Sequence, residues 1–329
     1  MQTKRILFIN FGGLGDEILF LPTIQTVKKE FPNSHITLAL EERSKGIISL
    51  TDVIDDTLFA NIKGKGKYFE LLKLLFKIWR GKYNIVISSG SNKFISIFLA
   101  LTFIREKYGY NTGKLSEILL TKAILLNKNQ YAVQMYHDLA QGVTTIKTEL
   151  PHLSIQKKPI MQNSVLIHPG VSKISVQKGM IKTISAEEWA KVVEELSNKG
   201  KNVYLIGGPD DKECIETIVK LVPENKFTNL YGTTKNLKEL AELISSAENF
   251  LCSDSAPLHV AVALGVKTFV IFGSTDDKKL IPQSDKVIPI KADCDCPLQP
   301  CLWERRQTTC ETLDCLKISS NQIVETILN

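Results

Sequence analysis

The sequence of 329 residues lacks an apolar run long enough to cross a membrane. The longest candidate, residues 94–104, falls well short of the roughly 18 residues that a span needs, and it contains Ser96 and Thr102. The N-terminus enters an apolar strand within a few residues, so no signal peptide is visible. These absences predict a cytoplasmic protein. The apolar content of 43% is that of a globular chain with a substantial core.

A complete dinucleotide-binding fingerprint is also missing. Gly13 and Gly15 follow the opening strand, but Ile18 stands where a third glycine would be needed. Asp16 puts a carboxylate at the helix end where a pyrophosphate would sit, and like charges repel. A nicotinamide enzyme is therefore disfavoured. Two interpretations of Asp16 remain open, a general base and a helix N-cap.

Positive charge is concentrated in the first half of the chain. Residues 1–160 contain 22 Lys and Arg against 13 Asp and Glu, whereas residues 161–329 contain 19 and 22. The basic half either faces an anionic substrate or membrane, or is simply solvated. Nucleic-acid binding is disfavoured because the cations are not interleaved with aromatic platforms of a recognisable module.

One segment of this basic half is apolar almost all round. Residues 63–82 contain seven cations, and residues 67–80 predict a helix. Such a helix can lie on an anionic membrane surface. Alternatively it is a crossover helix packed on a sheet, with its cations extending outward into water.

Strands alternate with helices along the whole chain, which predicts βαβ units and parallel sheets. The polar stretch at residues 157–164 precedes a restart of the pattern, so we expect domains at 1–160 and 161–329. Residues 91–130 are helix-rich but ambiguous. We expect strands at 5–11, 36–40, 53–54, 83–88, 165–168, 202–206, 250–252 and 267–272, and helices at 17–31, 68–79, 185–198, 236–247 and 320–328.

The stretch from residue 250 to 265 is the centre of the second domain. It predicts a buried strand end, a polar loop and a short helix that ends at Gly265. Asp254 and Ser255 lie where an N-cap belongs, and His259 lies one turn further in. A second strand follows and ends in a polar loop with Thr275. Because a helix N-terminus attracts anions, we predict a nucleotide-diphosphate pocket at these strand ends.

Two further polar loops follow strands of the same domain. His168-Pro169-Gly170 ends its first strand, and Lys173, Lys178 and Lys182 come next, as phosphate ligands or as solvated lysines. Residues 207–211, Gly-Gly-Pro-Asp-Asp, end the next strand. Asp211 either binds the hydroxyls of a ribose or caps the following helix.

Five of the seven cysteines gather near the C-terminus. Cys294, Cys296, Cys301, Cys310 and Cys315 fall within 22 residues. In a cytoplasmic protein such a cluster indicates metal or reactive thiols more often than disulfides, although no Cys-x₂-Cys pair is present. A structural iron or zinc site is therefore one hypothesis. The string Asp293-Cys294-Asp295 resembles a metal-binding DxD, and we interpret it as coincidence because it lies past the other motifs.

Four motifs in order carry a family resemblance: Gly15-Asp16 with Leu21-Pro22, His168-Pro169-Gly170, Gly207-Gly208-Pro209, and residues 254–259 with Gly265 and residues 272–275. Together they resemble glycosyltransferase family 9, typified by the ADP-heptose:lipopolysaccharide heptosyltransferases, over nearly the whole chain. The resemblance implies an α/β protein of the GT-B fold, in which two Rossmann-like domains face each other across a cleft. The first would bind the acceptor and the second the nucleotide-sugar donor, with inversion at the anomeric carbon.

The resemblance also implies roles for individual residues. Asp16 would be the catalytic general base, and Gly13 and Gly15 would form the acceptor-side loop. Lys182 would contact donor phosphate, and Asp211 would lie near the donor ribose. The implied donor-binding set is His168, Lys182, Gly207, Asp211, Asp254, Ser255, Ala256, His259 and Thr275. The chain departs from the family at Asp211, where glutamate is usual, at Ala256, where glycine is common, and at Ser274, where proline is frequent.

The predicted function is transfer of a heptose, or a related sugar, from an ADP-heptose-type donor to the lipopolysaccharide core or another cell-envelope glycan. No metal is expected to be required for the chemistry. A protein acceptor and a nonenzymatic sugar-nucleotide-binding module are the alternatives. We expect a cytoplasmic location, with peripheral contact at the cytoplasmic face of the inner membrane left open.

Overall fold

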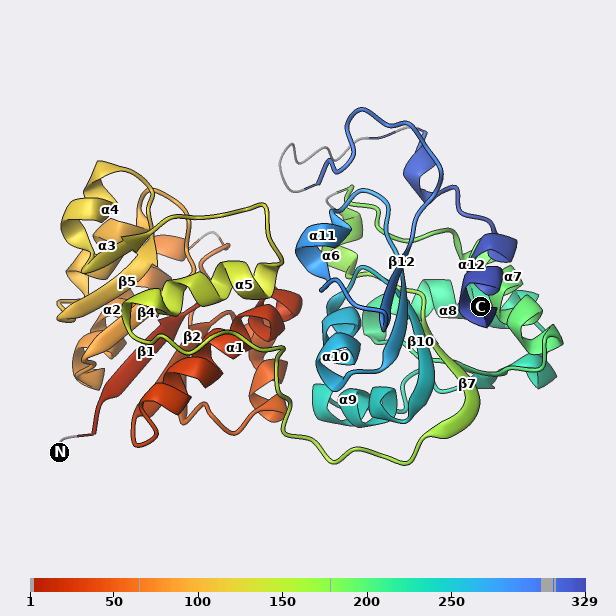
Figure 1. Ribbon diagram of the computed structural model, residues 1–329, viewed down its shortest axis with the longest axis horizontal. Coiled ribbons are helices and arrows are strands. Elements are labelled where there is room, and N and C mark those ends of the chain that lie inside the picture. Colours follow the sequence, from red (N-terminus) through yellow and green to blue (C-terminus); the bar gives the residue numbers. More distant parts are fainter. Residues whose placement is uncertain (1–2, 65, 178, 303–309, 311) are drawn as a thin grey trace. The chain divides into compact units, whose positions relative to one another are not determined.

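The computed structural model describes residues 3–64, 66–177, 179–302, 310 and 312–329, and it divides into two compact units (Figure 1). Unit 1 is Met1–Ser154 and unit 2 is Ile155–Asn329. The division lies six residues before the boundary expected from sequence. Residues 155–160 go with unit 2 because the Lys158 backbone N–H donates to Ser245 Oγ at 3.0 Å, and the Lys157 ammonium donates to the Leu264 carbonyl.

Unit 1 is built on a parallel sheet of six strands. The strands are β1 (Arg5–Ile9), β2 (His35–Leu40), β3 (Asp56–Phe59), β4 (Ile85–Ser88), β5 (Glu106–Tyr110) and β6 (Lys122–Ile124). Their order is β3-β2-β1-β4-β5-β6, with Ile6 of β1 in register with Ile36 and Ile85 of its neighbours. This is the strand order of a Rossmann fold. The chain adds β2 and β3 on one side of β1 and then returns to add β4, β5 and β6 on the other side.

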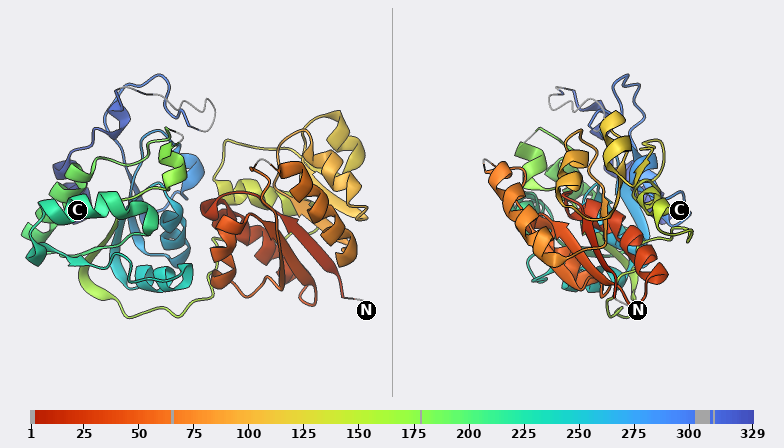
Figure 2. Two further views of the ribbon diagram at one scale, coloured as in Figure 1. Left: turned by 180° about the vertical axis from the view of Figure 1, so that it is seen from behind. Right: turned by 90° about the vertical axis from the view of Figure 1, so that its left-hand side faces the viewer.

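Helices cover both faces of this sheet. They are α1 (Leu14–Glu30), α2 (Lys67–Gly81), α3 (Ile95–Leu101), α4 (Lys114–Leu119) and α5 (Ala132–His137), with 3₁₀ turns η1 (Glu42–Leu50) and η2 (Asp138–Gly142). On one face Phe8 of β1 meets Phe20 of α1 edge-on at 5.9 Å, and α5 packs beside α1 (Figure 1). On the other face Leu7 and Ile9 of β1 pack against the inner residues of α2 and α3 (Figure 2).

Unit 2 repeats this topology. Its strands are β7 (Met161–His168), β8 (Asn202–Leu205), β9 (Thr228–Asn229), β10 (Ala247–Ser253), β11 (Lys267–Ile271) and β12 (Val287–Ile290), in the order β12-β11-β10-β7-β8-β9. If β7 to β12 are renumbered 1 to 6, this order is 6-5-4-1-2-3, which is the order of unit 1 listed from the opposite edge strand. The helices are α6 (Lys173–Gln177), α7 (Ala186–Asn198), α8 (Lys212–Leu221), α9 (Leu237–Ser245), α10 (Ala256–Leu264), α11 (Asp277–Leu280) and α12 (Ser320–Leu328), with η3 (Pro209–Asp211), η4 (Glu224–Lys226) and η5 (Asp314–Leu316).

Two helix ends in unit 2 carry local caps, and the helix end expected at Gly265 is confirmed. Ser185 accepts a hydrogen bond from the Glu188 backbone at the start of α7, and Gly265 ends α10 with a φ of 72°, a left-handed conformation that favours glycine. Across the described residues of both units, no helix is both long enough and apolar enough to cross a bilayer.

Three local expectations are wrong. Helix α1 begins at Leu14 rather than residue 17 and continues through Pro22, because the Asp16 carboxylate accepts from the Gly13 N–H and fixes the first turn earlier. The third strand is β3, a few residues after the expected 53–54. The ambiguous region at 91–130 contains two strands, β5 and β6, whose partly exposed residues gave no clear apolar run.

Candidate functional site

In unit 2 the predicted donor residues gather where parallel strands end. His168 ends β7, Gly207 follows β8, Asp254 follows β10 and Thr275 follows β11. Because β7, β8, β10 and β11 are neighbours and parallel, these residues share one edge of the sheet. Ligands of open α/β sheets bind outside this edge, so the sheet presents the predicted set on the expected side.

An ion pair lies at this edge. The Lys182 ammonium is 3.0 Å from Asp254 Oδ2, and Asp254 is buried while Lys182 keeps a partly exposed side chain. A buried carboxylate needs such a partner, since an unpaired charge would be costly to desolvate. Lys182 thus presents a cation at the surface beside the N-terminus of α10. The Lys173 backbone N–H bonds to Asp210 of the loop that follows β8, and Lys178 is outside the described residues.

A hydrogen-bond network fixes the chain on both sides of Lys182. Thr183 Oγ1 donates to the Pro169 carbonyl at 2.7 Å and accepts from the hydroxyl of Ser253 at 2.7 Å. On the other side, Ser274 Oγ donates to the Ile181 carbonyl at 2.9 Å. Three strand-end loops are therefore tied to the segment that carries Lys182, which holds the cation in place without a ligand.

The start of α10 is shaped to receive an anion. Ser255 is the N-cap, with extended backbone, and its side chain makes no hydrogen bond to the first turn. Ala256 and Pro257 open the helix, and His259 is buried one turn in. An N-terminus left without a side-chain cap offers backbone N–H groups and positive partial charge to a phosphate. Thr275, buried on the neighbouring loop, has a hydroxyl with no hydrogen-bond partner among the described residues.

Asp211 is enclosed by its own loop. Its Oδ2 accepts from the Gly208 N–H at 2.7 Å and lies 3.3 Å from His168 Nε2, and the side chain is buried. A Cβ added to Gly170 would meet Asp211 Oδ1 at 1.7 Å, so only glycine fits at that position. The geometry is that of a helix cap which also orients His168. A contact between Asp211 and a ribose stays a prediction.

In unit 1 the predicted base lies in the first turn of α1. Gly13 is the N-cap, Gly15 is in the same turn, and the Gly13 N–H donates to Asp16 Oδ2 at 2.7 Å. The hydroxyl of Tyr136, from α5, donates to Asp16 Oδ1 at 3.2 Å. Burial, followed by the charge of Asp16, raises the pKa of Tyr136 well above its usual value, so Tyr136 stays a donor. Asp16 is thus oriented from two sides and remains partly exposed.

Glu17, next to Asp16, is fully enclosed. Burial, and then the charge of Asp16, raises the pKa of the Glu17 carboxyl well above its usual value. The side chain of Asn10 lowers this pKa in part, but burial outweighs it. Burial therefore favours the protonated form of the Glu17 carboxyl, whereas Asp16 beside it stays partly exposed.

Sequence reasoning missed several of these groups. Tyr136 lies 120 positions from Asp16, and no local pattern links them. Glu17 is next to Asp16 in the sequence, but its burial depends on the packing of α1 and is not visible from the sequence. Thr183 follows Lys182 in the sequence, and Ser253 precedes Asp254. This adjacency to predicted residues was the signal that could have identified the hydrogen-bonded pair.

The cysteine-rich segment at 294–315 lies against the loop that carries Thr275. The backbone N–H groups of Cys301 and Leu302 donate to the Ser274 carbonyl at 3.0 and 3.2 Å. Four cysteines line one cavity of about 300 Å³ there: Cys296, Cys301, Cys310 and Cys315. Cys294 is outside that lining, its thiol 3.6 Å from Gln299 Oε1. Among the described side chains, no three His, Cys, Asp or Glu residues are assembled as metal ligands.

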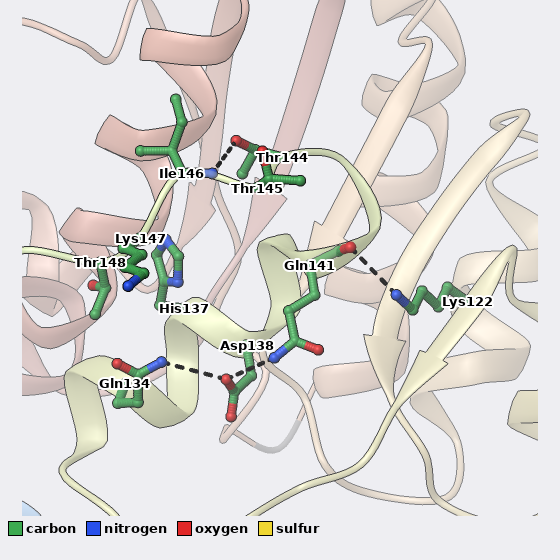
Figure 3. Close-up of a pocket in the computed structure, with 10 residues that line it drawn as sticks. All are labelled: Lys122, Gln134, His137, Asp138, Gln141, Thr144, Thr145, Ile146, Lys147 and Thr148. Carbon is green, nitrogen blue, oxygen red and sulfur yellow. Dashed lines mark hydrogen bonds between the residues drawn. The ribbon is translucent and has the colours of Figure 1, made fainter.

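One pocket of unit 1 contains none of the predicted site residues (Figure 3). It has a volume of about 620 Å³ and is bounded by the end of α5, η2 and residues 144–148. Asp138 in its wall accepts from the side-chain amides of Gln134 and Gln141. Burial lowers the pKa of His137, which also borders it. This pocket is separate from the Asp16 carboxylate.

Comparisons with known proteins agree over most of the chain. The model of glycosyltransferase family 9 (heptosyltransferase) matches residues 71–309. Lipopolysaccharide heptosyltransferase 3 of Escherichia coli K12 is 24% identical over 295 residues, which cover 83% of this chain and 84% of that protein. The solved family 9 glycosyltransferase of Veillonella parvula DSM 2008 superposes with a TM-score of 0.79 at 22% identity, covering 100% and 97% of the two chains.

A third comparison concerns TibC of enterotoxigenic E. coli H10407, described as an iron-containing dodecameric glycosyltransferase. Its TM-score is 0.61 at 13% identity, with 100% of this chain and 79% of that chain covered. A structure of TibC, there described as a heptosyltransferase, has also been solved in complex with ADP-D-beta-D-heptose.

Proposed function

This chain belongs to glycosyltransferase family 9 (heptosyltransferase), and on that premise we propose that it transfers a heptose from ADP-heptose to the lipopolysaccharide core with inversion. It is a glycosyltransferase of the GT-B fold, with one Rossmann-like sheet in each unit. The names of its relatives support the sugar and the acceptor, and the TibC complex supports the ADP nucleotide.

The observation that carries the proposal is the Lys182–Asp254 pair at the uncapped N-terminus of α10. A nucleoside diphosphate bound there would meet a cation and a positive helix end together. Asp254, being buried, is best placed to position Lys182 rather than to touch the phosphates. In this proposal Ser255, Ala256 and Thr275 line the diphosphate site. His168, Gly207, Asp211 and His259 complete the donor set.

Asp16 of unit 1 acts as the general base in this proposal. It accepts the proton of the acceptor hydroxyl as the oxygen attacks the anomeric carbon. The new C–O bond forms on the face opposite the departing diphosphate, whose own C–O bond breaks and retains the electron pair. The proton held by Asp16 then passes to water. Attack from the far face gives the inverted anomer.

Charge stabilisation of the departing ADP is assigned to Lys182 and the α10 N-terminus. Fixed donors aimed at developing charge are effective because they need no reorganisation during the reaction. Base catalysis adds about 10²–10⁴-fold in rate. In this scheme no step passes through a metal ion.

We also propose that the cysteine-rich segment binds a structural iron or zinc. The support is the cavity shared by Cys296, Cys301, Cys310 and Cys315, together with the iron described for TibC. Burial, and then the neighbouring cysteines, raises the pKa of Cys315 to about 11, so binding would have to displace thiol protons. Metal analysis of freshly purified, unchelated protein is expected to find near-stoichiometric iron or zinc, which Cys296→Ser/Cys301→Ser should lose. A metal-free wild type would contradict this.

A donor screen tests the transfer proposal. The protein is heated with ADP-heptose, ADP, UDP-sugars, GDP-sugars or NAD, and the unfolding temperature is read. A ligand at about 100 times its Kd adds roughly 2.7 kcal/mol to the free energy of unfolding, which is readily measured. We expect the largest shift with ADP-heptose. A larger shift with another nucleotide sugar would overturn the choice of heptose, and a response to NAD alone would overturn the donor site.

The acceptor is tested separately, by incubating ADP-heptose with lipopolysaccharide core fragments and identifying the product by mass and by its anomeric NMR coupling. We expect heptose on the core in the inverted configuration. Retention of configuration would contradict the Asp16 mechanism, and transfer to protein alone would contradict the acceptor. Because the lipopolysaccharide core is built on a membrane-anchored lipid, we place the enzyme at the cytoplasmic face of the inner membrane.

A further inference from the structure

Helix α2 has an apolar face on each side. Its inner residues Leu74, Leu75 and Ile78 are buried against the sheet, so it is a crossover helix. Its outer side nevertheless exposes further large apolar side chains: Tyr68, Phe69, Leu72, Phe76 and Trp79. A helix covering a sheet ordinarily turns a polar face to water. The outer face of α2 is thus apolar without being part of the core.

The apolar character continues across the next two helices. Phe94 and Phe103, at the two ends of α3, are 77% and 78% exposed, and Ile118 of α4 is 77% exposed. Ile97, Leu101 and Leu115 on these helices are also exposed. Figures 1 and 2 show α2, α3 and α4 grouped at the same side of unit 1. We call the outer sides of these three helices the apolar-basic surface.

Contacts between the helices make this surface continuous. The Trp79 indole N–H donates to the Leu101 carbonyl at 2.9 Å, and its ring lies 6.1 Å from that of Phe103. Phe76 packs edge-on against Trp79 at 5.1 Å, and α3 packs against α4. Among the described residues of unit 2, by contrast, only six large apolar side chains are exposed, against thirteen in unit 1. Scattered residues are normal, whereas a contiguous patch marks a binding surface.

The charges around this surface have one predominant sign. Residues 67–125 contain ten Lys and Arg but only three acidic residues, all Glu. Lys67 and Lys73 lie over the rings of Tyr68 and Phe69 at 5.0 and 4.3 Å from the centroids. Aromatic side chains ringed by cations are complementary to a layer with an apolar interior and an anionic surface. A second copy of the chain would bring like charges together, which opposes self-association.

We propose that the apolar-basic surface docks unit 1 onto an anionic lipid membrane. Tyr68, Phe94, Phe103 and Ile118 enter the headgroup region, and the lysines and arginines around them contact lipid phosphates. The surface lies on the face of the sheet opposite α1, whose first turn contains Asp16. Docking therefore leaves the α1 face uncovered, and it goes beyond the sugar transfer proposed above.

The test is co-sedimentation of the full chain with vesicles that contain phosphatidylglycerol, and with vesicles of phosphatidylcholine alone. The test variant is Tyr68→Ser/Phe94→Ser/Ile118→Ser, three of the most exposed positions and none part of the buried core. The matched control is Ile160→Ser/Val176→Ser/Leu221→Ser, which removes exposed apolar side chains from unit 2. Thermal unfolding and light scattering accompany each sample.

We expect wild type and control to bind anionic vesicles alike. The test variant should partition at least about tenfold less, because it loses apolar area that would be buried in the membrane. Partitioning of Lys77→Glu/Lys114→Glu onto anionic vesicles should fall about fivefold for each cation removed. Added salt should also weaken binding of the wild type, because it screens the charges. Equal binding of test variant and control, or no binding by wild type, would overturn the proposal. So would a wild-type oligomer that dissociates in the test variant, since the surface would then join copies of the chain.

The donor screen is read on the same samples. The test variant should keep the wild-type temperature shift with ADP-heptose, because none of its substitutions is in the proposed donor set. A chain that binds vesicles but no nucleotide sugar refutes only the transfer proposal. A chain that binds donor but not vesicles refutes only the docking proposal.

Discussion

Units 1 and 2 share one topology but differ in the side chains that lie outside their cores. Both sheets have six parallel strands in the same Rossmann order. At its α1 end, unit 1 has the Asp16 carboxylate beside the buried Glu17, whereas the strand ends of unit 2 hold the cation Lys182 beside an uncapped helix. In the function proposed above, the same backbone thus serves a proton acceptor in one unit and an anion site in the other.

The outer helices differ as well. Helices α7 and α8 of unit 2 bury apolar residues and present charged ones such as Glu187 and Lys212, while α2 of unit 1 is apolar on both sides. The comparison teaches that topology fixes where a site lies and leaves its chemistry to a few residues at strand ends. The predictions below separate the contributions of the two units.

The largest effect is expected from Asp16→Asn in unit 1. The amide keeps the shape of the side chain but cannot accept a proton, so turnover should fall by about 10²–10⁴-fold. Initial rates of sugar transfer measure this. Asp56→Asn, which changes an exposed carboxylate on β3, is the matched control and should keep wild-type turnover. Turnover within about threefold of wild type would exclude Asp16 as the base.

Lys182→Ala in unit 2 is expected to weaken donor binding. Loss of a hydrogen bond to a charged group costs about 1.5–3 kcal/mol, or roughly 10–100-fold in Kd for ADP-heptose. Calorimetric titration measures it, with the exposed Lys212→Ala as control. An unchanged Kd would place the diphosphate elsewhere. Because the variant leaves Asp254 buried and unpaired, Lys182→Arg, which keeps the charge, should restore much of the affinity.

Gly170→Ala should destabilise unit 2. The new Cβ would lie 1.7 Å from Asp211 Oδ1, so the loop must shift at a cost of about 1–3 kcal/mol in the free energy of unfolding. Denaturant titration gives the value. Gly66→Ala, where a Cβ meets nothing within 4 Å and φ is −120°, should change stability little. Equal stability of the two variants would show that Asp211 is not held as tightly as its contacts indicate.

The smallest effect is a pH dependence from Glu17. Because folding raises its pKa, Glu17 stabilises unit 1 while protonated, and this stability is lost as pH rises from the unfolded to the folded pKa. Glu17→Gln cannot ionise, so its unfolding temperature should gain on wild type as pH rises through that window. Glu42→Gln, at an exposed site, should run parallel to wild type throughout. A parallel course for Glu17→Gln would mean that Glu17 is not buried as described.

Much of the fold could be predicted because alternating strands and helices leave a periodic apolar pattern. The end of α10 at Gly265 was visible because capping is local. Strands β5 and β6 were not, since β5 contains two charged residues and a glycine and the edge strand β6 has only three residues, so neither forms an apolar run. Of the site, the shared strand edge of unit 2 followed from topology. The contacts of Tyr136 with Asp16 and of Gly170 with Asp211 did not, because residues far apart in sequence meet only in the folded chain.

The central claim is that unit 2 binds the donor while unit 1 supplies the base. Its most direct test is a calorimetric titration of ADP-heptose into Asp16→Asn. The account predicts a Kd within about twofold of wild type, in a protein whose turnover is lost. A donor affinity reduced as much as the turnover would contradict the division of labour, because Asp16 would then act in donor binding rather than in proton transfer.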